Sequence, residues 1–357
     1  MNSQTFDRQA LLRRDPGQVG QSLSRLPDQL RDGWRQARRV KLPASYRAID
    51  RVAICGMGGS HLAADILRHA LAEQLTVPVE IVADYILPRW VNPKTLVIAS
   101  SYSGGTEETL AALTSARRRQ AKIVVITSGG KLATLARRWR LPLYHYQPTE
   151  NPSGQPRLGV AYGMMALLAC WRSLRLISIS PADIQELSAV AWEAVRRYGP
   201  QQPVNRNVAK QLAMSWQKSV PLLIGAEWTA GNLHTWANQI NENAKTFAAW
   251  YLLPDLNHHL LEGLRNRTLT KQLKAVMVID DTYHRHTQRR FVLTAKILNQ
   301  LGASVAIWKP HGTTRLEKAI DLLAFGGYVS WYLAAARHVK PAPIPTVDWL
   351  KTQLAKR

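Results

Sequence analysis

The sequence predicts an α/β protein made of two tandem units, each a doubly wound parallel sheet with helices on both faces. Short apolar runs alternate with helical stretches in residues 51–175, and the same alternation restarts in residues 206–340. A breaker segment of Gly, Pro and Gln separates the halves at residues 199–203. The chain has 357 residues, of which 46% are hydrophobic, so two domains of ordinary size can each bury a core.

Residues 1–50 precede the first strand and are predicted to form a helical arm. Leu23, Leu26, Leu30 and Trp34 recur at near-helical spacing and would share one face of a helix. Such a face packs against a neighbouring element, so we expect the arm to have a packing role.

The first unit, residues 51–175, contains five apolar runs that read as strands, because each is short and bounded by turn residues. The ligand crevice of such a sheet lies at the carboxyl ends of its strands, so the Gly/Ser loops after the first and third runs should open into it. The predicted strands begin near residues 52, 77, 96, 122 and 142.

The loop S-Y-S-G-G-T after the third strand has the composition of a phosphate cradle. Ser101, Ser103 and Thr106 supply hydroxyl groups, while Gly104 and Gly105 let backbone N–H groups turn toward an anion at the start of the next helix. An ordinary polar turn with Thr106 as the helix N-cap explains the same residues. The motif alone leaves both interpretations open.

The first loop, G-M-G-G-S at residues 56–60, partly matches a dinucleotide-binding fingerprint. His61 occupies the place of the third glycine, so a nicotinamide cofactor is not predicted. Cys55, just before the loop, is predicted to be a core thiol. The second cysteine, Cys170, lies far away in another apolar run, which indicates an intracellular, reduced and therefore cytoplasmic protein.

Arg157 stands alone as a charged residue before the apolar segment 158–171. That segment is too short to span a bilayer and is predicted to be a buried helix. The N-terminus has no apolar signal region, so no membrane association is expected. At the mouth of a buried helix, the Arg157 guanidinium could stabilise an oxyanion or pair with a carboxylate.

The second half repeats the α/β pattern after a predicted helical linker at residues 176–205. Its predicted strands are 220–226, 274–280 and 304–309, its predicted helices are 228–243, 290–301 and 316–337, and residues 341–357 form a terminal helix. Glu242, near the end of the first of these helices, would by itself read as a surface carboxylate or an i,i+3 partner of Lys245.

The charge balance is strongly basic, with 47 Lys+Arg against 24 Asp+Glu and a net charge of +23. Such a field attracts anionic substrates and also nucleic acid. The basic clusters at residues 117–119, 137–140 and 285–290 fall where solvated surfaces are expected. Because no RNA-binding motif or zinc module accompanies them, nucleic acid is a possible partner that we do not predict.

Five motifs resemble those of the bifunctional phosphoglucose/phosphomannose isomerases, which are built from tandem sugar isomerase (SIS) domains. In chain order they are GMGGS, SYSG-x-TEET, PSG-x-PR, NEN-x-K followed by LNH, and a terminal LK. The resemblance implies a cofactor-free aldose–ketose isomerase that interconverts glucose 6-phosphate, and mannose 6-phosphate as well, with fructose 6-phosphate. A non-catalytic sensor of phosphosugars with the same fold is the alternative.

The resemblance also assigns roles to individual residues. Glu242 would be the base that carries a proton between neighbouring carbons, and Arg157 would stabilise the enediolate. His258 would open the sugar ring, which suits an imidazole group as acid and base, and Lys351 would complete the ring-opening group. The residues implied in phosphate binding are Gly59, Ser60, Ser101, Ser103 and Thr106.

This chain departs from the family pattern at four positions. Gly105 replaces the usual Asn of the phosphate loop, and Gly327 stands where relatives commonly have Asp. After the ring-opening histidine, His259 replaces Asn and Leu260 replaces an acidic residue.

The expected partners are a hexose 6-phosphate and a second copy of the chain, because in the family the histidine loop completes the neighbouring subunit's site. No metal site is predicted. The adjacent histidines of the LNHH motif cannot easily share one tetrahedral ion, and neither an H-E-x-x-H motif nor a cysteine pair supports them or the histidines at 284 and 286.

Overall fold

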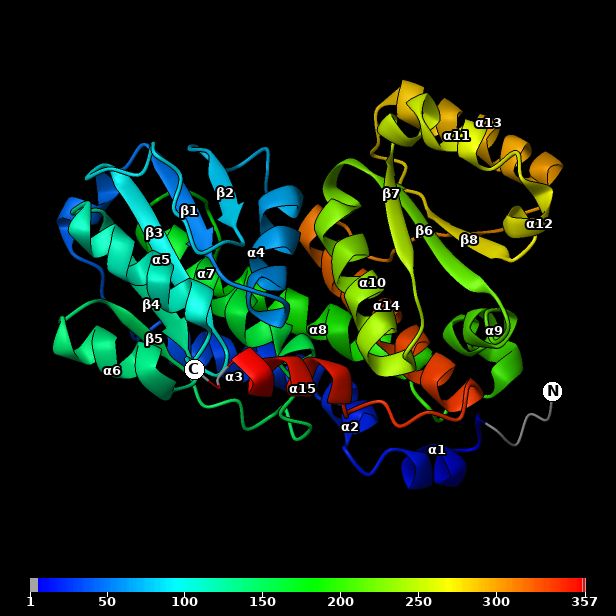
Figure 1. Ribbon diagram of the computed structural model, residues 1–357, viewed down its shortest axis with the longest axis horizontal. Helices are drawn as coiled ribbons and strands as arrows, with labels where there is room; N and C mark the ends of the chain where they lie inside the picture. Colours follow the sequence, from blue (N-terminus) through cyan, green and yellow to red (C-terminus); the bar gives the residue numbers. More distant parts are fainter. Residues whose placement is uncertain (1–5, 355, 357) are drawn as a thin grey trace.

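The computed structural model describes residues 6–354 and 356, and it confirms the predicted fold class. Two separate parallel sheets lie on opposite sides of a group of central helices (Figure 1). The first has the order β2-β1-β3-β4-β5 and the second the order β7-β6-β8-β9. The strands are β1 Arg51–Cys55, β2 Val79–Val82, β3 Thr95–Ser101, β4 Lys122–Thr127, β5 Leu143–His145, β6 Val220–Ala226, β7 Ala249–Leu253, β8 Leu273–Val278 and β9 Ser304–Trp308.

Both faces of the first sheet are buried, because alternate side chains of each strand point to opposite sides. Ala53, Val97 and Val125 face the helices α5 and α6, whereas Ile54 and Ile98 face the large core shared with α4 and α7. The covering helices of this unit are α4 Gly59–Ala70, α5 Glu107–Arg118, α6 Gly130–Arg138 and α7 Val160–Ser173.

The N-terminal arm is helical, as predicted, but it consists of three helices, α1 Arg8–Arg14, α2 Val19–Ser24 and α3 Leu26–Ala37. The helix predicted across Leu23 to Ala37 is interrupted at Arg25, just before Pro27, which lacks a backbone N–H and therefore fits the first turn of a new helix. Leu30 and Trp34 are buried against α7 and α8, which confirms the packing role of the arm.

The remaining helices lie in the linker, the second unit and the C-terminal segment. These are α8 Pro181–Tyr198, α9 Val208–Ser215, α10 Ala230–Ala244, α11 Leu260–Gly263, α12 Arg267–Thr270, α13 Arg285–Leu301, α14 Arg315–Ala336 and α15 Pro345–Leu354. The short 3₁₀ helices of the chain are η2 Ala44–Arg47, η3 Pro156–Leu158, η4 Val204–Arg206, η5 Glu227–Thr229 and η6 Asp255–His258. Helix α8 occupies the predicted linker and packs between α3 and α14, while the domain boundaries themselves stay a prediction.

Helix α14 is the longest apolar helix among the described residues, longer than the segment 158–171 that the sequence suggested. By length and composition it could cross a membrane, but its apolar window is wholly buried inside the protein. It therefore behaves as a core helix between the two units, and residues 158–171 are likewise buried.

The helices α4 and α10 pack closely against each other between the two units. A Cβ atom on Gly231 would lie only 2.2 Å from the main-chain carbonyl oxygen of Asp65. Glycine is therefore required at this crossing, because any side chain would push the helices apart. Since α4 begins at the loop after β1 and α10 ends near Glu242, this contact links the two ends of the candidate site described below.

Both cysteines are buried free thiols, as predicted for Cys55. Burial raises the pKa of each thiol to about 12, so neither is a nucleophile at neutral pH.

Candidate functional site

The strand order of the first sheet reverses between β1 and β3, so the loops after these strands meet at its topological switch point. The hydroxyl of Ser60, from the first loop, accepts a hydrogen bond from the N–H of Tyr102 in the second at 2.9 Å. Ser100 donates in turn to the carbonyl of Ser60 at 2.8 Å. The two sequence motifs therefore form one polar surface.

Contacts among its own residues hold the S-Y-S-G-G-T loop in its conformation. Ser101 is buried, and its Oγ accepts a hydrogen bond from the N–H of Gly104 and lies 2.8 Å from Oγ1 of Thr106. Gly104 has a φ of +69°, and a Cβ there would lie 1.9 Å from the carbonyl oxygen of Gly129. Only glycine fits this turn, which packs against the loop that follows β4.

Thr106 is the N-cap residue of α5, as the alternative interpretation of this turn expects, but its hydroxyl makes no capping bond to the helix. Its contact is with Ser101 instead. The first-turn N–H groups of α5 therefore keep their capacity to bind an anion. The exposed Ser103 and the half-buried Ser60 and Thr106 border the same helix start.

Gly59 brings the second group of predicted residues to this surface. A Cβ on Gly59 would lie 2.8 Å from the backbone nitrogen of Arg157, so the G-M-G-G-S loop rests directly on the P-S-G-x-P-R segment. Asn151 supports the contact by donating from Nδ2 to the Tyr102 hydroxyl and to the carbonyl of Gln155, both at 3.0 Å.

Arg157 is 1% exposed and connects the two halves of the chain. Its Nη1 donates to Oε2 of Glu242, from the last turn of α10, at 2.9 Å. Of the two sequence interpretations of Arg157, the structure shows pairing with a carboxylate. Burial lowers the pKa of the Arg157 guanidinium, and the Glu242 carboxylate opposes this shift.

Glu242 keeps 30% of its side chain exposed, although its ion-pair partner is buried. Lys245 does not pair with the Glu242 carboxylate as helix spacing would suggest. Its Nζ donates to the main-chain carbonyl of Glu242 at 2.6 Å. The carboxylate is thus held by Arg157 on one side and is open to solvent on the other.

Sequence reasoning missed several groups that hold this arrangement together. Asn243 accepts a hydrogen bond from Nε of Arg157 at 2.7 Å, and the main-chain carbonyls of Pro341 and Ala342 accept from its Nη2. Asn243 belongs to the N-E-N-x-K motif, so its sequence position was visible. The carbonyls carry no sequence signal.

The two predicted ring-opening residues, His258 and Lys351, do not contact Arg157. His258 lies on η6, after β7, whereas Glu242 lies near the end of α10, before that strand. Lys351 is exposed on α15, one turn after Asp348, whose charge acts on Arg157. Within one chain, Lys351 therefore shares α15 with a residue whose charge reaches Arg157, and His258 follows β7.

The crossing of α4 and α10 carries a cluster of ionisable side chains. Asp65 lies 2.7 Å from Nδ1 of His234 and 2.9 Å from Nη2 of Arg68. Burial would raise the pKa of Asp65, but His234 and Arg68 outweigh it and lower this pKa to about 2. His61 packs on His234 with ring centroids 5.5 Å apart, and burial lowers its pKa. The cluster ties the two units together beside the first loop.

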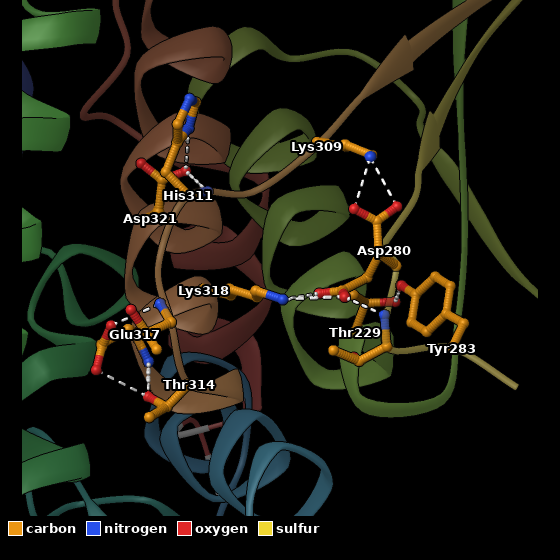
Figure 2. A network of polar contacts seen from close by, with 12 residues as sticks. Thr229, Asp280, Tyr283, Lys309, His311, Thr314, Glu317, Lys318 and Asp321 are labelled. Carbon is orange, nitrogen blue, oxygen red and sulfur yellow. Dashed lines mark hydrogen bonds and ion pairs between the residues drawn. The ribbon is translucent and has the colours of Figure 1, made fainter.

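The equivalent edge of the second sheet, between β6 and β8, is filled by protein side chains (Figure 2). Nζ of Lys318 lies 3.0 Å from Oδ1 of the buried Asp280, which follows β8. Thr314 and Glu317 cap the start of α14 with their own side chains. The start of α14 is thus capped by its own side chains, in contrast to the start of α5.

The structure shows how much room a side chain would have at two of the positions that depart from the family pattern. At Gly105 an added Cβ would approach nothing closer than Ser103 Oγ at 3.9 Å, so a side chain fits there. At Gly327 a Cβ would lie 2.5 Å from Cδ2 of Leu23, so glycine at 327 and leucine at 23 suit each other.

Gly105→Ala is expected to raise the free energy of unfolding by about 0.4–1 kcal/mol, because it restricts the unfolded chain without a clash in the folded one. Urea denaturation measures this change. Gly104→Ala is the matched control and should destabilise, since its φ and the Gly129 carbonyl both exclude a side chain. A loss of stability in Gly105→Ala would contradict the open space seen here.

Comparisons with known families agree with the two-unit organisation. A model of the SIS domain matches residues 45–156, and a model of the bacterial phospho-glucose isomerase C-terminal SIS domain matches residues 205–354. Among solved structures, a hypothetical protein from Thermus thermophilus aligns with a TM-score of 0.72 at 20% identity, over 98% of this chain and 93% of that one. This likeness shows the fold.

Curated relatives extend the match to nearly the whole chain. A bifunctional phosphoglucose/phosphomannose isomerase of Caldicellulosiruptor bescii is 33% identical over 339 residues, which are 94% of this chain and 98% of the relative. One of the same name from Aquifex aeolicus is 28% identical over 85% of this chain and 90% of the relative. The protein is therefore a member of the bifunctional phosphoglucose/phosphomannose isomerase family, with two SIS-type units.

Proposed function

We propose that this enzyme interconverts glucose 6-phosphate and mannose 6-phosphate with fructose 6-phosphate, with Glu242 as the proton-transferring base. The relatives that cover most of the chain carry both activities in their names. The observation that supports the residue assignment is the ion pair between Arg157 and Glu242, because it holds a half-exposed carboxylate of the second unit beside the loops of the first.

The chemistry requires one base and a site for an anion. The Glu242 carboxylate takes the proton from C2 of the open-chain aldose, the C2 electron pair forms the C1–C2 double bond, and the carbonyl bond shifts to O1 as an enediolate. Transfer of the O2 proton to O1 and return of the first proton to C1, while the C2–O2 bond becomes the carbonyl, give the ketose, so the base is regenerated. Glucose and mannose 6-phosphates differ only at C2 and give the same planar enediolate, which explains how one site serves both.

The phosphate group would bind at the uncapped start of α5, near Gly59, Ser60, Ser103 and Thr106. Helix N-termini favour negative charge through their unpaired N–H groups and dipole. In the structure the hydroxyl of Ser101 makes contacts inside its loop, so its part in this site would be to shape the loop.

A coupled assay of fructose 6-phosphate formation from each of the two aldose phosphates tests the proposal. The purified protein should turn over both glucose 6-phosphate and mannose 6-phosphate to fructose 6-phosphate. Retained binding of these sugars with no turnover of either would favour a phosphosugar sensor instead.

The ring-opening residues point to a homodimer as the active form. His258 is exposed and lies at the far end of β7 from Glu242, so it would serve the site of a neighbouring subunit, where Lys351 would assist it. The two buried free thiols suit a reducing cytoplasm, and the proposed reaction belongs to hexose phosphate metabolism such as glycolysis.

Mixing two inactive variants tests this sharing of sites. Glu242→Gln and His258→Asn should each be nearly inactive alone. In a statistical mixture, half of the dimers are mixed, and each mixed dimer has one site with both groups intact, so about a quarter of wild-type activity should return. Activity that stays at the level of the separate variants, or a fully active monomer by light scattering, would contradict the shared site.

A further inference from the structure

Basic residues gather at the edge of the first sheet where its strands begin. The strands are parallel, so a helix that returns from the end of one strand must finish where the next strand starts. Helices α5 and α6 both do so, and their last turns are basic. Four segments of the chain therefore reach this edge, namely residues 47–51, 87–95, 117–122 and 137–142.

The ends of α5 and α6 contact each other and the segment that leads to β3. Arg117, in the last turn of α5, lies over the ring of Trp139 at the end of α6, 4.3 Å from the ring centroid. Arg119 donates from Nη2 to the carbonyl of Leu87 at 3.1 Å. The two basic clusters that end these helices, which are separate in the sequence, are therefore neighbours in the structure.

The starts of β1 and β4 join the same surface. Arg51, the first residue of β1, lies over the ring of Trp90, 5.8 Å from its centroid. Lys122, the first residue of β4, donates to the carbonyl of Pro93 at 2.7 Å. Side-chain contacts thus connect all four segments into one continuous surface.

This surface is almost free of acidic groups. The only carboxylate in the four segments belongs to Asp50, and Nε of Arg51 donates to it at 2.9 Å. Arginine predominates over lysine, and most of these cations are exposed. We call the arginines and lysines of the four segments the basic edge.

The basic edge lies away from the candidate active site. That site is at the carboxyl ends of β1 and β3, whereas the basic edge is at their amino ends. The seven residues of β3 span roughly 20 Å at about 3.3 Å per residue. The cations of the basic edge are therefore too distant to hold the phosphate group of a substrate in the site.

The side chains of the basic edge suit the phosphate backbone of a nucleic acid duplex. Guanidinium groups bind phosphate oxygens in a planar, bidentate geometry. A duplex carries about one negative charge per 1.7 Å of its axis, so cations spread over several strands and helix ends can meet several phosphates at once. Trp90 and Trp139 are half-buried beneath guanidinium groups, so they are not free to stack on the bases of a single strand.

An anionic membrane fits the same surface less well. Surfaces that bind membranes combine basic residues with exposed apolar side chains, which enter the interface. The structure describes every residue of the four segments, and none of their large hydrophobic side chains is exposed. The basic edge therefore offers charge without an apolar anchor.

We propose that the basic edge binds double-stranded nucleic acid through its phosphate backbone, without preference for sequence. RNA and DNA duplexes share this backbone chemistry. Because the surface is separate from the candidate active site, a bound duplex leaves the loops after β1 and β3 open to a sugar phosphate.

Fluorescence anisotropy with short labelled duplexes of DNA and of RNA measures the binding to the full-length protein. Wild-type affinity should fall steeply as the salt concentration rises, because bound phosphates release counterions. A triple variant with Arg89→Gln, Arg118→Gln and Arg138→Gln should bind at least about tenfold more weakly at about 50 mM salt, with a salt slope lower by about 2–3. These arginines are exposed and come from three of the segments, so the midpoint of urea denaturation should not change.

A second triple variant is the matched control. Arg206→Gln, Arg265→Gln and Arg285→Gln together remove the same charge from exposed positions of the second unit, so the affinity should stay within about threefold of wild type. Replacement of the three arginines of the basic edge by lysine keeps their charge, and most of the salt slope should remain.

The measurements separate the basic edge from net charge and from a membrane surface. Binding of either duplex that depends on the basic edge supports the proposal, and the duplex that binds more tightly identifies the partner. Three results would overturn it: no binding of either duplex at about 50 mM salt, equal weakening in both triple variants, or binding to phosphatidylglycerol vesicles with none to the duplexes. Each is measured without a sugar phosphate, so the result is independent of the isomerase assay.

Discussion

Glu242→Gln is expected to lower kcat on the order of 10³–10⁴-fold for both aldoses, with KM within about threefold of wild type. The amide oxygen of glutamine can still accept the hydrogen bond from Nη1 of Arg157, so the site keeps its shape. What is lost is the ability to take and return a proton. Steady-state kinetics with each hexose phosphate, together with deuterium exchange from solvent at C2, measure the effect.

A second glutamate provides the control for this substitution. Glu262, on α11, leaves 83% of its side chain exposed and pairs only with the exposed Arg265 among the described residues. Glu262→Gln should therefore retain wild-type kcat. If Glu242→Gln also retained it, or still exchanged the C2 proton at the normal rate, Glu242 would not be the base.

Arg157→Met is expected to abolish measurable activity and to lower the free energy of unfolding by about 3–5 kcal/mol. The substitution leaves a carboxylate without its partner and removes the donor from a buried amide oxygen and two main-chain carbonyls. Arg157→Lys should rescue little, because one ammonium cannot reproduce five donors in a planar fork. Urea denaturation and kcat measure the two consequences separately.

Arg31→Met is the matched control for stability. Arg31 pairs with Asp28 on the surface of α3, with 61% of its side chain exposed, so its loss should cost less than about 1 kcal/mol. A similarly small cost for Arg157→Met would show that the buried bonds of Arg157 do not hold the two units together.

Much of the fold was predictable because its strands are buried. The run of residues 96–99 is apolar throughout, since both faces of the first sheet are covered. The strand β7 was missed for the opposite reason: at the edge of the second sheet, four of its five residues are only half-buried, and its sequence A-W-Y-L-L is short. The break at Arg25 lies just before Pro27, so its sequence signal was the proline and not the apolar spacing.

The candidate site was predictable only where side chains carry its chemistry. Glu242 and Arg157 stand out by residue type and motif, and the structure places them together. The acceptors at Pro341 and Ala342 are main-chain groups that any residue could supply, so their role follows from tertiary structure alone.

The contact of Gly231 with α4 has a consequence for selectivity on the proposed function. Helix α4 starts at the loop that would bind the phosphate group, and α10 ends near Glu242, the proposed base. The tight crossing at Gly231 therefore fixes the distance between the groups that would hold the two ends of the sugar. A pentose phosphate whose phosphate group is bound at the same place would be one carbon too short to present its C2 to the carboxylate. Chain-length discrimination would then depend on a residue that never touches the sugar.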